Sequence, residues 1–155
     1  MPDTSTESAA AREIEQSRVF AAPRELVFTA FTDPHHIAQW WGPNGFTNTV
    51  HSMDVRPGGS FRFVMHGPDG KDWPNLIVYT EVVRPERLVY SHGSGEENDP
   101  NGFHVTVTFD EEDGGTKVTM TSLFASAEAR AAVAGFAIEG GKQTLARLAA
   151  YLETM

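Results

Sequence analysis

Histidines and carboxylates are the side chains of this sequence whose types could support metal or acid–base chemistry. The chain has six histidines and 21 Asp and Glu residues, but no cysteine. Without cysteine there are no disulfides, no thiolate metal sites and no cysteine nucleophile. Neither an H-x-H nor an H-E-x-x-H pattern occurs, although such spacing is typical of zinc sites. His35 and His36 are neighbours on a predicted helix, and the other four histidines fall in different predicted strands. We therefore predict no metal site.

Acid–base catalysis would require a titratable group that faces a binding cavity. The candidates are His92, Glu81 and Arg62, with His66 behind them. Arg62 alternates with two phenylalanines and is expected to face solvent. The face of Glu81 stays open, and a cavity-facing Glu81 would indicate function, because ionised groups are rarely buried unpaired. No nucleophile triad, phosphate-binding glycine loop or dinucleotide fingerprint is recognisable. The sequence therefore predicts no catalytic residue and no cofactor.

Length and charge limit the class of protein. A chain of 155 residues fits one domain, and its net charge of −9 repels a phosphate backbone, so nucleic acid is not an expected partner. The N-terminal residues show no basic start and no apolar run, and no segment approaches the roughly 20 apolar residues of a membrane span. We expect a cytoplasmic protein with no membrane span. Residues 1–11, which are small and polar, are predicted to form a disordered tail before a single domain at residues 12–155.

Two short helices are predicted after a first strand at residues 13–20. The first helix opens at Ala22, with Pro23 at its first position, where a missing amide proton costs nothing. The second has Asp33 as its N-cap and Pro34 at its first position. It runs to about Trp41 and ends at the following Gly-Pro pair.

The centre of the chain has the alternation of an antiparallel sheet. Strands are predicted at residues 46–54, 61–65, 76–83, 88–92, 103–109 and 116–121, with a polar loop at 93–101. Asp113, Gly114 and Gly115 join the last two strands as a hairpin. The clean alternation of apolar and polar residues at 103–109 indicates one buried and one solvated face.

A long helix follows from about Ser126, and its apolar side carries Leu145, Leu148 and Leu152. Gly140 and Gly141 interrupt this helix, which predicts a break, a kink or a close contact. One helix is too narrow to cover a sheet of about seven strands. The sheet must therefore curl around the helix, and some space is expected to remain between them.

The residues also resemble a known family. The segments 18–23 (RVFAAP), 25–28 (ELVF), 32–34 (TDP) and 40–43 (WWGP) are similar to the opening of the heat-shock-protein-90 ATPase activator homologue family. The segments 56–59 (RPGG), 67–70 (GPDG), 85–89 (PERLV), 105–109 (VTVTF) and 114–117 (GGTK) continue the similarity in order. This family belongs to the START-related, birch-pollen-allergen-like superfamily (SRPBCC). The resemblance implies an α+β helix-grip fold with six or seven curved antiparallel strands, and a deep hydrophobic cavity.

The resemblance does not supply a reaction, because members of the superfamily bind lipids, hormones or polyketides, or act as cyclases. We expect a protein that binds a small apolar or aromatic molecule in its cavity. A cyclase- or aromatase-type enzyme and a co-chaperone-like interaction module remain alternatives. The expected cavity residues are those of the inner sheet face and its rim: Trp40, Trp41, Phe61, Phe63, Met65, Tyr79, His92, Phe103, Val105, Val107, Met120, Phe124 and Phe136.

Overall fold

The computed structural model describes residues 9–93 and 102–155. It contains one antiparallel sheet of seven strands, ordered β1-β7-β6-β5-β4-β3-β2, together with four helices. The strands are β1 (Glu13–Phe20), β2 (Thr47–Met53), β3 (Ser60–His66), β4 (Asp72–Val83), β5 (Arg87–Gly93), β6 (Phe103–Glu112) and β7 (Gly115–Leu123). The helices are α1 (Ala9–Arg12), α2 (Arg24–Thr32), α3 (Pro34–Trp40) and α4 (Ala127–Leu152). The predicted order of strands and helices is confirmed, with α1 as an addition.

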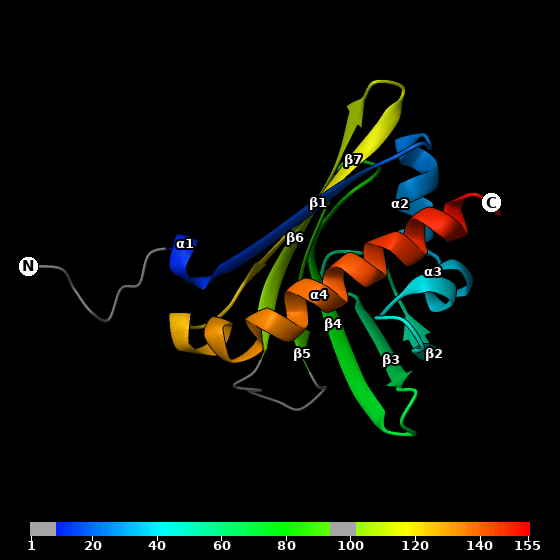
Figure 1. Ribbon diagram of the computed structural model, residues 1–155. Coiled ribbons are helices and arrows are strands. Elements are labelled where there is room, and N and C mark those ends of the chain that lie inside the picture. The colour runs from blue at the N-terminus through cyan, green and yellow to red at the C-terminus, as the bar shows by residue number, and fades with distance from the viewer. Residues whose placement is uncertain (1–8, 94–101) are drawn as a thin grey trace, which may run out of the picture.

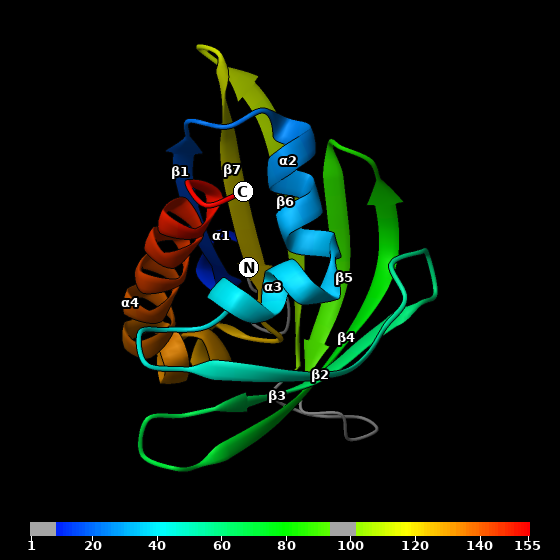
Figure 2. The ribbon, with the colours of Figure 1, turned by 90° about the vertical axis from the view of Figure 1, so that its right-hand side faces the viewer.

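The sheet curves around the helices. In Figure 1, α4 runs diagonally across the sheet beside β1, and its C-terminal end lies near α2 and α3. Figure 2 shows α2 and α3 in the hollow between β5 and α4, where they carry the chain from β1 at one edge to β2 at the other. Neighbouring strands are otherwise joined in sequence order, as is usual for antiparallel sheets. This architecture is the predicted helix-grip fold.

Short polar side chains start two of the helices. The carboxylate of Asp33 accepts hydrogen bonds from the amides of His35 (2.9 Å) and His36 (3.3 Å) at the start of α3. The hydroxyl of Ser126 accepts one from the amide of Ala129 (3.0 Å) at the start of α4. Each bond satisfies a backbone donor that has no partner within the first helical turn. The Asp33 cap was predicted from the sequence, and Ser126 was predicted only as the approximate start of the long helix. Pro23 lies one residue before α2 rather than at its first position.

Two boundaries differ from the sequence prediction. Residues 9–11, the last part of the predicted tail, belong to α1, whose Arg12 exchanges hydrogen bonds with the backbone of Phe124. This long-range contact gives a short alanine-rich segment a fixed partner, which local sequence patterns do not reveal. β4 begins at Asp72, four residues before the predicted start at 76, because residues 72–75 pair with β3. Pro74 is tolerated there since β5 pairs with β4 only from Leu76 on, which leaves one edge of this segment unpaired among the described residues. Of the predicted loop at 93–101, Gly93 is the last residue of β5, and residues 94–101 lie outside the described residues.

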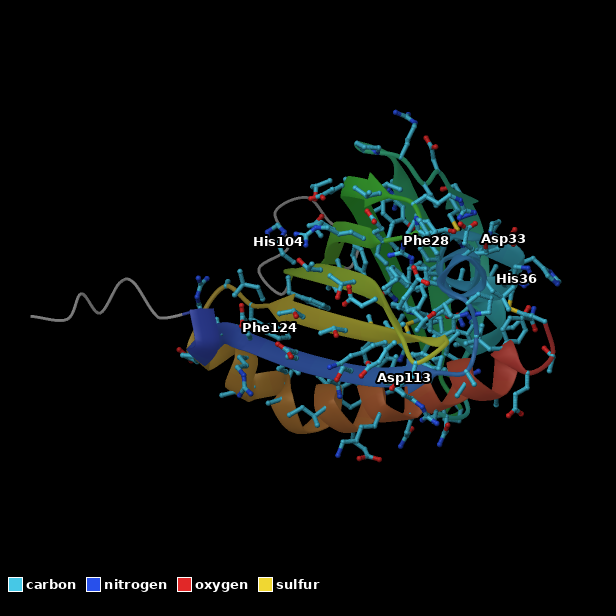
Figure 3. All side chains as sticks on the ribbon, turned by 90° about the horizontal axis from the view of Figure 1, so that it is seen from above. Phe28, Asp33, His36, His104, Asp113 and Phe124 are labelled. Atoms are coloured by element: carbon cyan, nitrogen blue, oxygen red, sulfur yellow. The ribbon has the colours of Figure 1, made fainter. Side chains whose placement is uncertain are left out.

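The interior is solid at one end of the fold. Aromatic rings of α2, α3 and β6 meet edge to face there: Phe28 with Phe109 (5.1 Å between centroids) and Phe31 with Phe109 (5.2 Å) and Trp40 (4.8 Å). The C-terminal half of α4 packs on this cluster through Leu145, Leu148 and Leu152, all buried. The labelled Phe124 and His36 in Figure 3 mark the two ends of α4, with His36 at the packed end.

Candidate functional site

A cavity of about 360 Å³ lies at the other end of the fold, between the sheet and the N-terminal half of α4. Its wall comes from the start of β1 and β6, the ends of β5 and β7, and α4 from Ala129 to Thr144. Because neighbouring strands are antiparallel, the start of one strand lies beside the end of the next, so these segments all lie at the same end of the sheet. Met65 near the end of β3 also lines the cavity, together with Trp41, Gly42 and Pro43, which join α3 to β2.

The structure brings together eight of the thirteen residues expected from the sequence to form the cavity. Those eight are Trp41, Met65, His92, Phe103, Val105, Met120, Phe124 and Phe136. Phe103 and Val105 share the inner face of β6, and Met120 lies on that of β7, as the alternation predicts. Phe124 follows one residue after the end of β7. Phe136 is 74% exposed and lies at the rim with the exposed Val133.

The other five expected residues, Trp40, Phe61, Phe63, Tyr79 and Val107, are buried in the core and do not line this cavity. Trp40 is 0% exposed, and its indole nitrogen donates to the carbonyl oxygen of Ala30 (3.1 Å). The adjacent Trp41 is the residue that reaches the cavity. Phe63 lies one layer behind the wall, with its ring centroid 6.4 Å from that of Trp41 and 6.2 Å from that of His92.

Several wall residues were not expected from the sequence. Gln16 and Ser122 are polar residues on the inner face of their strands, and Tyr90 lies two residues before His92 on the same face of β5. Alternation along the strands is the one sequence signal that could have indicated these three residues. The remaining unexpected positions are Ile14, Gly42, Pro43, Gly102, Ala129, Val133, Ala137, Gly140, Gly141 and Thr144.

The glycine pair in α4 marks a close contact. The helix continues through Gly140 and Gly141, so of the three predicted alternatives the break does not occur. A Cβ atom on Gly141 would overlap the side-chain amide of Gln16, whose Nε2 donates to the carbonyl oxygen of Ile138 (2.8 Å). Gly141 therefore lets β1 approach α4 at the cavity wall, whereas Gly140 faces Pro43.

The wall is mainly apolar, and none of its described residues carries a formal charge at neutral pH. Its titratable groups are Tyr90 and His92. Burial, reinforced by the nearby Tyr79, raises the pKa of Tyr90, so its hydroxyl stays protonated. Burial lowers the pKa of His92 from 6.5 to about 4, so its imidazole is neutral at pH 7. Nε2 of His92 lies 2.8 Å from Oδ1 of Asn75.

The other acid–base candidates lie outside the cavity. Arg62 is exposed, as predicted. Glu81 pairs with Arg87 at 3.1 Å on the surface. Nε2 of His66 lies 2.7 Å from the hydroxyl of Thr49, and its Nδ1 lies 2.7 Å from Asp72. The hydrogen-bonded series Thr49–His66–Asp72 has the connectivity of a nucleophile triad. None of these three residues lines the cavity, and Thr49 and Asp72 are exposed.

Two further features are absent from the described residues. No group of three or more His, Asp or Glu side chains within residues 9–93 and 102–155 is arranged to hold a metal ion. The helices described there also include none with the length and apolar character needed to cross a membrane.

Lowering the pH is expected to weaken the fold through His92. Since its pKa is lower in the folded protein, the unfolded protein binds more protons between about pH 4 and 6.5. The stabilisation is complete above pH 6.5 and is lost as the pH falls through this window. We expect wild type to lose on the order of 1 kcal/mol more than His92→Phe between pH 7 and 5. Urea melts at both pH values measure the difference; His104→Phe, at an exposed histidine, should lose as much as wild type. A loss in His92→Phe equal to that of wild type would contradict the expectation.

The curved sheet around a long helix, with an apolar cavity between them, defines a helix-grip domain of the START-related superfamily. The model of the family described as activator of Hsp90 ATPase homolog 1-like protein matches residues 21–153, and the chain belongs to this family. The resemblance seen in the sequence is thereby confirmed.

Solved structures share the fold over nearly the whole chain. A protein from Mycobacterium smegmatis is 29% identical, with a TM-score of 0.82, and the match covers 94% of this chain and 93% of that one. A protein from Chromobacterium violaceum is 28% identical, with a TM-score of 0.82 and coverage of 92% and 97%. A protein from Nitrosomonas europaea, at 24% identity and a TM-score of 0.85, covers 96% and 99% and shows the fold alone. No curated protein matches the sequence.

Proposed function

We propose that this protein binds a small hydrophobic or aromatic molecule in the cavity between the sheet and the N-terminal half of α4. The observation that carries the proposal is a space of about 360 Å³ whose wall is mainly apolar and bears no charged side chain. Binding sites for small molecules are typically concave and apolar, with a few polar groups that orient the ligand. Tyr90 and His92 are polar groups of that kind. The adaptable side chains of Met65 and Met120 suit a wall that closes on a ligand.

Two features favour binding over the alternatives. A cyclase-type enzyme would move protons, and a histidine whose pKa is lowered to about 4 is a weak base. An interaction module of co-chaperone type would present a contiguous apolar surface. The exposed large hydrophobic residues within the described part of the chain come from β1, β4, α4 and the C-terminus. Of these, Val133 and Phe136 lie at the cavity itself, where they suit a rim that a ligand passes.

The proposal is tested by titration with an uncharged naphthalene dye. We expect saturable binding with one site per chain, because apolar rings leave water for the cavity. Met120→Trp fills part of this space and should weaken binding by about tenfold or more, a change of ~1.4 kcal/mol. Thr121→Trp is the matched control, because adjacent residues of a strand face opposite sides of the sheet.

Tryptophan fluorescence provides a second readout. The dye should change the emission of Trp41, which lines the cavity, so the response should disappear in Trp41→Phe. Trp73→Phe removes an indole that is 51% exposed on β4 and should keep the response. Absence of saturable binding to wild type, or equal binding by both Met120→Trp and Thr121→Trp, would refute the proposal.

A further inference from the structure

A chain of hydrogen bonds determines which nitrogen of His92 carries the proton. The side-chain amide nitrogen (Nδ2) of Asn75 donates to the backbone carbonyl oxygen of Trp73 at 2.8 Å, and this bond fixes the orientation of the Asn75 side chain. Oδ1 of Asn75 therefore faces Nε2 of His92, also at 2.8 Å. Because this oxygen can only accept, Nε2 must donate.

The other nitrogen of His92 remains an open acceptor. A neutral imidazole has one proton, and with that proton on Nε2 the lone pair is on Nδ1. Within residues 9–93 and 102–155, Nδ1 has no hydrogen-bond partner. The buried side-chain nitrogen and oxygen atoms that lack a partner there are Nε of Arg12 and Oδ1 of Asn48, so Nδ1 keeps accessible surface. His92 lines the cavity, which is the space available to this acceptor.

Aromatic rings surround the imidazole of His92. The imidazole centroid lies 5.1 Å from that of Phe103, 6.3 Å from that of Trp41 and 6.4 Å from that of Tyr90. Tyr90 belongs to the same face of β5 and also lines the cavity. Its hydroxyl has no hydrogen-bond partner among the described residues and can donate to a ligand. The cavity thus combines flat apolar rings with one hydrogen-bond acceptor, Nδ1 of His92, and one donor, the hydroxyl of Tyr90.

We propose that the cavity selects an aromatic ligand that carries a hydroxyl group, which donates to Nδ1 of His92 and accepts from the hydroxyl of Tyr90. The inference rests on the proposed ligand-binding function and specifies the class of ligand. A hydroxyl is uncharged and is both donor and acceptor, so it satisfies both groups. A carboxylate would face the lone pair of Nδ1 in a wall without a cation, and burying its charge would be costly.

Three uncharged probes separate this inference from the proposed function. Naphthalene has no polar group, 2-methoxynaphthalene has an acceptor only, and 2-naphthol has both a donor and an acceptor. We expect calorimetry at pH 7 to show 2-naphthol binding to wild type about 3- to 10-fold more tightly than 2-methoxynaphthalene, the effect of one added hydrogen bond.

Two variants assign the effect to each residue. His92→Phe keeps a ring but removes the acceptor, so it should abolish the preference for 2-naphthol over 2-methoxynaphthalene. Tyr90→Phe should weaken both oxygenated probes relative to naphthalene and leave their mutual ratio unchanged. His104→Phe, at an exposed histidine of β6, should behave as wild type. The ratio of the affinities for 2-naphthol and 2-methoxynaphthalene is compared between variants. The added bulk of the methoxy methyl group affects each variant alike and cancels in this comparison.

The possible results are distinguishable. If all three probes bind wild type equally well, the inference is wrong and the proposed binding function stands. If 2-naphthol is preferred to the same extent by wild type and His92→Phe, another group is the acceptor and the inference is again wrong. If no probe binds saturably, the proposed function fails, and the inference fails with it. Where a variant does not fold, equal binding of the three probes by wild-type protein still overturns the inference.

Discussion

Replacing Leu148 with alanine is expected to lower the free energy of unfolding by ~2–5 kcal/mol. Leu148 is 0% exposed and lies in the half of α4 that packs against the aromatic core. The substitution removes apolar surface from the core and leaves a void in a region that is already tightly packed, and both terms destabilise. Urea melts at pH 7, with the midpoint and slope determined for each protein, measure the loss.

Met120→Ala is the matched comparison within the same interior. Met120 is half-buried and borders the cavity, so truncation enlarges a space that already exists. We expect a loss of ~1–2 kcal/mol, close to the transfer term alone. Met120→Ala should also change dye affinity, whereas Leu148→Ala should act mainly through stability. Equal destabilisation by both substitutions would show that the cavity end is packed as densely as the core end.

Replacing Arg147 with methionine is expected to cost ~2–4 kcal/mol of stability and to weaken ligand binding. Its guanidinium donates to the carbonyl oxygens of Gly42 and Pro43 at 2.9 Å and of Phe46 at 3.0 Å, and more distantly to that of Trp41 at 3.3 Å. Burial lowers the pKa of Arg147, but an arginine stays charged at neutral pH. Methionine would remove these donors and free the segment that forms one wall of the cavity.

Arg147→Lys and Lys142→Met test the role of the planar guanidinium. Lysine keeps the charge but cannot spread its donors over the same carbonyl groups, so an intermediate loss is expected. Lys142 is exposed on α4, and Lys142→Met should change stability by less than about 0.5 kcal/mol. Urea melts and dye titrations on the same samples provide both readouts. If Arg147→Met behaves as Lys142→Met does, these hydrogen bonds contribute little.

The strands and helices could be predicted because their signals are local. Alternation at residues 103–109 placed Val105, Val107 and Phe109 on one face, and all three are buried. Asp33 marked the start of α3 because its side chain caps neighbouring amides, and the predicted start of the long helix near Ser126 coincides with a second cap in the structure. α1 was missed because its partner, Phe124, is more than a hundred residues away in the sequence. The early start of β4 was missed because pairing with β3 outweighs the presence of Pro74.

The candidate site was only partly predictable. Strand parity identifies which side chains face the interior, but not whether the helix above them leaves room. Val105 and Val107 have the same parity, yet only Val105 borders the cavity. Trp40 and Trp41 are adjacent, but Trp40 packs among the rings of the core while Trp41 turns to the cavity. No sequence rule distinguishes the members of these pairs.

The sequence by itself determined the order of strands and helices, the inward faces of the strands and the family, since each is encoded in local spacing or in an ordered series of motifs. The tertiary structure alone decided where the interior is solid and where it is hollow. Three helices share one concave sheet, and α2 and α3 fill the end where Leu145, Leu148 and Leu152 pack. At the other end α4 covers the sheet without them, so the space between helix and sheet stays open around His92.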